Sequence, residues 1–350
     1  MIILCFTSPD LSQTGKFYWA LFTYITFTTL YTIIAIPVGS LIPAMTQDRD
    51  ERTSLASFRY LGASSGSIAV AVLTLPLVGL FSSPQFGFPI VVGCLAVLGA
   101  IFAFLCFFNT KEVYSKPYEE TIGIKKVTKM VFNNYPLHFV ILALLTTWVA
   151  NNIKQLTVVY FVKYNLQLEA YFSPILLGVI LQIMFGAYLV NLIKHRFEKK
   201  TLFMIGTFLY VITDLIIYYI TGYENFWLLA FIATFGFIGF GMAGVMAWSM
   251  IADTIEYGEW KSGFRAEGVL NAAHVFVFKL SVGFSAWLAG VILESTDYVA
   301  NAIDQSPETL NGLFIMGYIF PAVAGTIAII VTYFNKYDSN FYERIFSELK

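Results

Sequence analysis

The chain has 350 residues, of which 58% are hydrophobic, 17% are aromatic and only 12% are charged. Its formal net charge of −1 gives no electrostatic reason to expect a nucleic-acid partner. The three cysteines lie in apolar runs and the three histidines are scattered, so neither a disulfide framework nor a metal or haem site is expected. The long apolar runs and a mean hydropathy of +0.72 instead predict an all-α polytopic membrane protein.

Nine apolar runs reach the roughly 17–25 residues that a helix needs to cross a bilayer. We expect spans at about 17–44, 55–81, 86–108, 136–162, 170–193, 201–221, 226–252, 267–293 and 310–334. The opening segment, residues 1–10, is too short for a signal peptide and has the character of the end of an earlier span.

Lysine and arginine residues set the expected orientation of these spans. Most of them fall in alternate loops, whereas the opposite loops hold only Lys16 and Lys163. Because cytoplasmic loops are enriched in these residues, we expect a cell (inner) membrane protein with a cytoplasmic middle loop and C-terminus. Within the middle loop, residues 125–132 have the pattern of a short amphipathic helix on the membrane surface.

The middle loop divides the chain into unequal parts. We expect a partial N-terminal bundle of three spans plus a remnant (1–108), a cytoplasmic middle loop (109–134), a C-terminal six-helix bundle (135–335) and a cytoplasmic tail (336–350). A long cytoplasmic connection often joins two six-span halves of a transporter, which leaves about three spans missing from the start.

Several polar residues interrupt the predicted spans. Lys279 lies deep in the eighth span, where an ammonium group costs a few kcal/mol unless it faces a polar cavity or a carboxylate. Asn152 and Lys154 belong to a polar cluster in the fourth span, which predicts either a cavity lining or hydrogen bonds between helices. Asp214 is a lone carboxylate in the sixth span, with a structural and a functional role equally open. Pro37 interrupts the first span and can border a binding site, although proline kinks also occur where nothing binds.

Two further patterns concern packing and charge. Four glycines of the seventh span, Gly236, Gly239, Gly241 and Gly244, predict close helix packing. Charges of both signs gather at residues 48–52 and 253–267, at the cytoplasmic ends of spans. We expect them to form salt bridges between the two halves that break in the other transport state.

The run from Asp253 to Gly268, with Phe278 and Lys279 after it, resembles the signature of the glycoside–pentoside–hexuronide:cation symporters, the melibiose-carrier group of the major facilitator superfamily. Residues 36–52, followed by Arg59, are similar to the segment after that family's fourth helix. The likeness covers essentially the whole chain. It implies a major facilitator fold of twelve helices, here lacking roughly the first three.

The resemblance also implies roles for particular residues. Tyr31 and Thr32 match positions around the family's cation site, and Lys279 matches a lysine near its cation and sugar sites. A Na⁺ site near Thr32 and Lys279 is therefore implied. Asn152 matches a polar position of the seventh helix. Two departures count against a full transfer of roles. Ala35 stands where some members have an aspartate, and the second helix, with the family's main cation-binding carboxylates, is absent.

These observations lead us to expect a secondary active transporter that moves a sugar, glycoside or uronide together with Na⁺ or H⁺ by alternating access. No cofactor other than the coupling cation is expected, and the partners are the small-molecule substrate and the lipid bilayer. A lipid or lysolipid carrier on the same fold remains an alternative. A membrane enzyme that modifies lipids is a weaker one, because no HxxxxD, DDxxD or HExxH run occurs. The candidate substrate and cation residues are Tyr31, Thr32, Arg59, Asn152, Lys154 and Lys279. The candidate gating residues are Arg52, Asp253, Glu256, Glu259, Lys261, Arg265 and Glu267.

Overall fold

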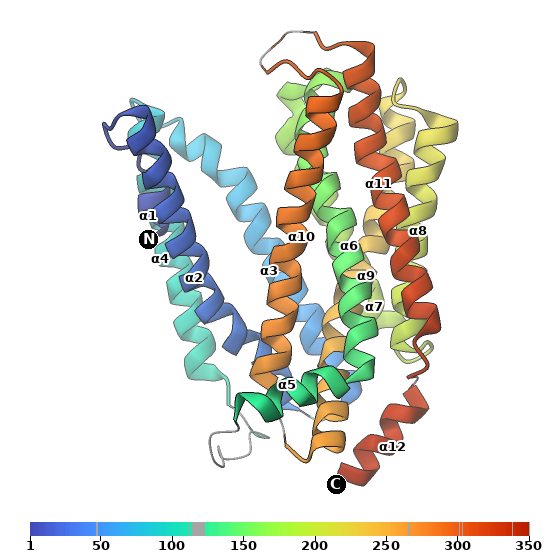
Figure 1. Cartoon of the computed structure of the whole chain (residues 1–350). Coiled ribbons are helices and arrows are strands. Elements are labelled where there is room, and N and C mark those ends of the chain that lie inside the picture. Colours follow the sequence, from blue (N-terminus) through green and yellow to red (C-terminus); the bar gives the residue numbers. More distant parts are fainter. Residues whose placement is uncertain are drawn as a thin grey trace. The chain divides into compact units, whose positions relative to one another are not determined.

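A computed structural model describes residues 1–46, 48–111, 113, 123–264, 267–300, 302, 304–337 and 339–349. Every element among these residues is helical. The long helices are α2 (Gln13–Met45), α3 (Arg49–Val78), α4 (Pro84–Asn109), α6 (Tyr135–Tyr160), α7 (Phe172–Ile193), α8 (Lys199–Ile216), α9 (Phe226–Ser262), α10 (Glu267–Ser295) and α11 (Pro307–Phe334). The short elements are α1 (Ile2–Cys5), α5 (Ile124–Asn133), α12 (Ser339–Leu349), the π-helical turns η1 (Phe161–Asn165) and η3 (Ile217–Thr221), and the 3₁₀ turn η2 (Glu169–Tyr171) (Figure 1).

The predicted number of spans is confirmed. Within the described residues, nine helices are long and apolar enough to cross a membrane. The largest difference in bounds is at α9, which continues ten residues beyond the predicted end at 252 and finishes at Ser262. Gly263 then ends it with a left-handed backbone (φ 76°), and its N–H donates to the Glu259 carbonyl at 2.8 Å. The charged run of 253–262 is therefore helical rather than a loop.

The chain separates into two compact units, and each is described by itself. The first unit holds residues 1–47 and 62–117, with α1, α2, α4 and the later part of α3. Its short α1 packs against α2 and α4, and the Trp19 indole N–H donates to the Thr7 carbonyl at 3.1 Å. Helix α2 continues through Pro37 without interruption.

The second unit holds residues 48–61 and 118–350, so the beginning of α3 belongs with α5–α12. Helix α9 packs against α7 and α8 through glycines, as predicted. A methyl group at Gly241 would lie 2.1 Å from the Ile183 carbonyl oxygen, and one at Gly239 would lie 2.4 Å from the Gly206 carbonyl oxygen. These distances leave no room for a side chain, so the glycines set the spacing of the helices.

The remaining helices of the second unit complete its core. Helix α6 packs against α10 and α11, and α8 packs against α11. The predicted amphipathic helix is present as α5, which crosses one end of the bundle in Figure 1. Its Met130 is buried against Leu137, Ile255 and Leu270. The lysines of α5 are exposed, so the helix divides into a bundle-facing apolar side and a charged side.

Candidate functional site

Two buried charges of opposite sign form a pair between α6 and α8. Lys154 Nζ contacts Asp214 Oδ1, and the two side chains are only 12% and 1% exposed. Each was a candidate from the sequence, but their partnership was not predicted. A buried charge needs an opposite charge beside it, because an isolated one loses its hydration without compensation. The pair therefore satisfies two residues that would each be costly alone.

Aromatic rings surround the ammonium group of Lys154. Its Nζ lies 4.6 Å from the centroid of the Tyr210 ring, 5.1 Å from that of Tyr318 and 5.3 Å from that of Phe237. Ring faces carry partial negative charge and attract a cation at this range. The rings come from α8, α11 and α9, so the lysine is held at a point where four helices converge.

A cavity of about 680 Å³ opens beside this lysine. It is lined by residues of α6, η1, α7, α9, α11 and the α6–α7 connection, all within the second unit. Most of the lining is apolar or aromatic, with Phe161, Trp227 and Phe237 among the rings. Of the described residues that line it, Lys154 alone carries a charge, while Thr157 and Gln182 add polar groups. A volume of this order, with few polar groups in an apolar wall, is typical of small-molecule sites.

The other sequence candidates of α6 and α10 occupy different surroundings. Asn152 donates a hydrogen bond from Nδ2 to Ser281 Oγ at 3.0 Å, which ties α6 to α10. This is the helix-to-helix role left open by the sequence, and Asn152 is not among the residues that line the cavity. Lys279 is half-buried in α10. Its role near a cation or sugar stays a prediction.

Two candidates lie in the first unit. Tyr31 is 54% exposed on α2. The Thr32 hydroxyl donates to the Thr28 carbonyl at 2.7 Å within the same helix. Because Thr32 and Lys279 belong to different units, the Na⁺ site implied for them also stays a prediction.

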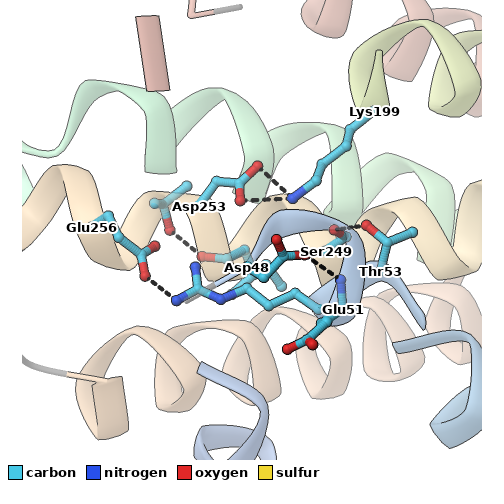
Figure 2. Close-up of polar contacts among 10 residues, drawn as sticks. Asp48, Glu51, Thr53, Lys199, Ser249, Asp253 and Glu256 are labelled. Carbon is cyan, nitrogen blue, oxygen red and sulfur yellow. Dashed lines mark hydrogen bonds and ion pairs between the residues drawn. The ribbon is translucent and has the colours of Figure 1, made fainter. Parts of the chain in front are cut away.

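At the opposite end of α9 from the cavity, one buried ion pair joins α9 to the beginning of α3 and another joins it to α8. Arg52 Nη2 lies 2.5 Å from Glu256 Oε1, with side-chain exposures of 0% and 2%. Lys199 Nζ contacts both carboxylate oxygens of Asp253, at 2.8 and 3.0 Å, as Figure 2 shows. An ion pair between Arg52 and the 253–267 cluster was expected. Asp253, in contrast, pairs within the second half of the chain, with the first residue of α8.

A hydrogen bond and a cation–π contact strengthen the same junction. Thr53 and Ser249 share a hydrogen bond of 3.1 Å, drawn in Figure 2. The guanidinium carbon of Arg59 lies 4.2 Å from the centroid of the Trp248 ring. The segment 48–61 is therefore tied to α9 by charge, hydrogen bonds and ring stacking together.

The remaining gating candidates are less informative. Glu259 is buried, and Lys261 lies 3.2 Å from the Tyr257 hydroxyl and 4.5 Å from the centroid of the Tyr135 ring. Arg265 and the side chain of Glu267 lie outside the described residues.

Comparison with known proteins adds the family context. Residues 1–339 match the family described as MFS/sugar transport protein. The chain is 34% identical over 336 residues to the uncharacterized symporter YjmB of Bacillus subtilis (strain 168), an alignment that covers 95% of this chain and 72% of that protein. It is 31% identical over 342 residues to the isoprimeverose transporter of Lactiplantibacillus pentosus, which covers 96% of this chain and 71% of that protein.

Proposed function

Because this chain belongs to the MFS/sugar transport protein family, we propose that it moves a sugar, glycoside or uronide across the cell membrane together with a cation. It is a multi-pass membrane transporter rather than an enzyme. The cation is Na⁺ or H⁺, and movement of the substrate follows alternating access. Two of the relatives, the uncharacterized symporter YjmB and the isoprimeverose transporter, support this choice of coupling and of substrate.

The cavity beside Lys154 is the observation that carries the substrate side of the proposal. Aromatic rings such as Trp227 and Phe237 offer flat apolar surfaces to the faces of a sugar ring. Lys154, Thr157 and Gln182 offer hydrogen bonds to its polar groups. The volume of about 680 Å³ accommodates a monosaccharide or a small glycoside.

The junction at the far end of α9 carries the alternating-access side. The Arg52–Glu256 pair is buried, so it is strong only while the segment 48–61 stays bound to α9. We assign it the role of holding one access state, with Arg59 on Trp248 as a second contact. In the orientation expected from the distribution of lysine and arginine, this junction faces the cytoplasm, and the cavity lies near the end of α9 that faces outward.

Uptake into proteoliposomes tests the proposal. The protein is reconstituted with an imposed Na⁺ or pH gradient, and radiolabelled glycosides and uronides are compared with a labelled lysolipid. We expect a sugar to accumulate against its concentration under one of the two gradients. Transfer of the lysolipid, with no sugar accumulated under either gradient, would establish the alternative carrier function instead.

A further inference from the structure

We propose that Asp214 is a proton-binding carboxylate, and that its protonation is linked to the capture of an acidic sugar by Lys154. The inference rests on the proposed function and deepens it. It names the coupling ion as H⁺, places its site in the second half of the chain, and gives the substrate class as a sugar that carries a carboxylate or sulfonate group.

The first observation is the unequal position of the two charges. Lys154 lines the cavity, whereas Asp214 does not and is only 1% exposed. An acidic group that enters the cavity therefore reaches the ammonium first. Of the described residues around the cavity, Lys154 alone offers a charge to such a group.

The second observation is that one buried oxygen atom of Asp214 and one of Gln182 lack hydrogen-bond partners among the described residues. Asp214 Oδ1 contacts Lys154, but Oδ2 has no hydrogen-bond partner. Gln182, on the cavity wall, donates from Nε2 to Thr234 Oγ1 at 3.0 Å, yet its Oε1 is buried and has no donor. Buried oxygens without donors are unfavourable. A proton bound to Asp214 Oδ2 removes the negative charge that no donor stabilises there, and a sugar hydroxyl would donate to Gln182 Oε1.

Binding of an acidic ligand to Lys154 should lead to protonation of Asp214, because an unpaired buried charge is costly. When the acid group of a ligand binds Lys154, the carboxylate of Asp214 loses the counter-ion that it has among the described residues. A buried carboxylate without a counter-ion binds a proton instead of staying charged. One O–H bond forms on Asp214 as the matching bond to hydrogen in a hydronium ion or buffer acid of the solvent breaks, and the ammonium remains paired throughout.

The surroundings of Asp214 favour a proton over a metal cation. The ionisable groups that face it are Lys154 from α6, Tyr210 from α8 and Tyr318 from α11, while α9 places Phe237 beside the ammonium. A Na⁺ ion at this carboxylate would meet the adjacent ammonium, which repels it. A proton adds no such charge, because it leaves the carboxyl group neutral.

Calorimetric binding measurements on the purified protein test the inference. Glucuronate and 6-deoxy-6-sulfoglucose serve as acidic ligands, and glucose is the matched neutral ligand. Titrations at pH 8 in buffers of different ionisation enthalpy count the protons taken up on binding. We expect the wild-type protein to take up a proton with either acid and none with glucose. Asp214→Asn, which resembles the protonated side chain, should bind the acids without proton uptake and with an affinity that does not change with pH.

A second set of variants tests the role of Lys154 in binding the acid group. Lys154→Gln should weaken binding of both acids by roughly 10- to 100-fold, because a charged hydrogen bond is lost, while glucose binding changes little. Lys163→Gln, at a lysine 37% exposed in the turn η1 that follows α6, is the control that should leave all affinities unchanged. The double variant Lys154→Gln/Asp214→Asn, which buries no unpaired charge, separates loss of binding from loss of fold.

Two results would overturn the inference. Proton uptake that persists in Asp214→Asn would place the proton elsewhere. Equal affinity of the wild-type protein for glucose and glucuronate would reject the acidic substrate class. If only one of the two acids binds, the class narrows to that acid group. Failure of every sugar to bind, with lysolipid bound instead, would count against the proposed function itself.

Discussion

Removal of one partner of the Arg52–Glu256 pair should release the beginning of α3 from α9. In Glu256→Gln the guanidinium of Arg52, which is 0% exposed, stays buried beside a neutral amide. Removing one member of a buried ion pair costs about 3–5 kcal/mol, because the remaining charge loses that counter-charge and gains no water in its place. Release of the segment 48–61 into water relieves this cost. The bound state should therefore lose at least about 100-fold in population relative to the released state.

Hydrogen–deuterium exchange reads this change directly. Backbone amides of the first turn of α3, where Arg52 N–H donates to the Asp48 carbonyl at 3.0 Å, should lose protection in Glu256→Gln. Glu169→Gln is the matched control, since its partner Lys163 lies 3.8 Å away and both side chains are well exposed. An exposed pair of that kind contributes about 1 kcal/mol or less. The charge reversal Arg52→Glu/Glu256→Arg should restore part of the protection.

The same measurement can refute the reasoning. If exchange of residues 48–61 in Glu256→Gln matches that of the wild-type protein and of Glu169→Gln, the buried pair does not hold this segment in place. Lost protection spread evenly over α6–α11 would instead assign the pair to general stability of the bundle, not to one access state.

Three further predictions concern packing, transport and pH. Gly241→Ala should lower thermal stability by about 1–3 kcal/mol or more, because its methyl group would meet a carbonyl of α7 at 2.1 Å, whereas Gly99→Ala, with open space around it, should change little in the same thermal melt. Asp253→Asn, which removes the carboxylate at Lys199, should lower the transport rate in proteoliposomes more than the substrate affinity, and unchanged rates would reject a gating role. The hydrogen bond from Arg344 lowers the pKa of Glu348. This hydrogen bond therefore stabilises α12 fully at pH values above the ordinary glutamate pKa, and the stabilisation is lost as the pH falls through the lowered pKa. Exchange protection of residues 339–349 should fall accordingly between pH 7 and pH 3, and Glu348→Gln should remove that dependence.

The fold was predictable because lipid imposes a simple rule on sequence. Each span must satisfy its own backbone inside the hydrocarbon, so it appears as one apolar run, and all nine runs became helices within the described residues. The close packing of α9 was equally predictable from its glycines, since small residues at helical spacing in a membrane span most often allow two helices to approach closely. The end of α9 was misplaced for the opposite reason. Its charges looked like a solvated loop, but Arg52 and Lys199, both distant in sequence, neutralise them inside the bundle.

The sequence indicated only some of the residues in and around the cavity. Polar residues inside apolar runs mark candidates one at a time, and Lys154 and Asp214 were both marked in this way. Gln182, in the fifth span, carried the same signal and was overlooked. The rings of Tyr210 and Tyr318 gave no signal, because aromatic residues are common in every span and only the packing of the helices selects which ones face the ammonium.

The sequence could not show which polar residues of different helices would contact one another. Lys154 lay in a cluster with Asn152, and nothing in their order indicated that one would bind a carboxylate on α8 and the other a hydroxyl on α10. Two residues apart on a helix point about 200° away from each other, so neighbours in sequence serve different neighbours in space. Asn152 thereby joins two helices, while Lys154 joins a buried carboxylate to a cavity. That difference in surroundings, rather than any difference in the pattern that marked them, is why the proposed proton and substrate linkage is placed at Lys154 and not at Asn152.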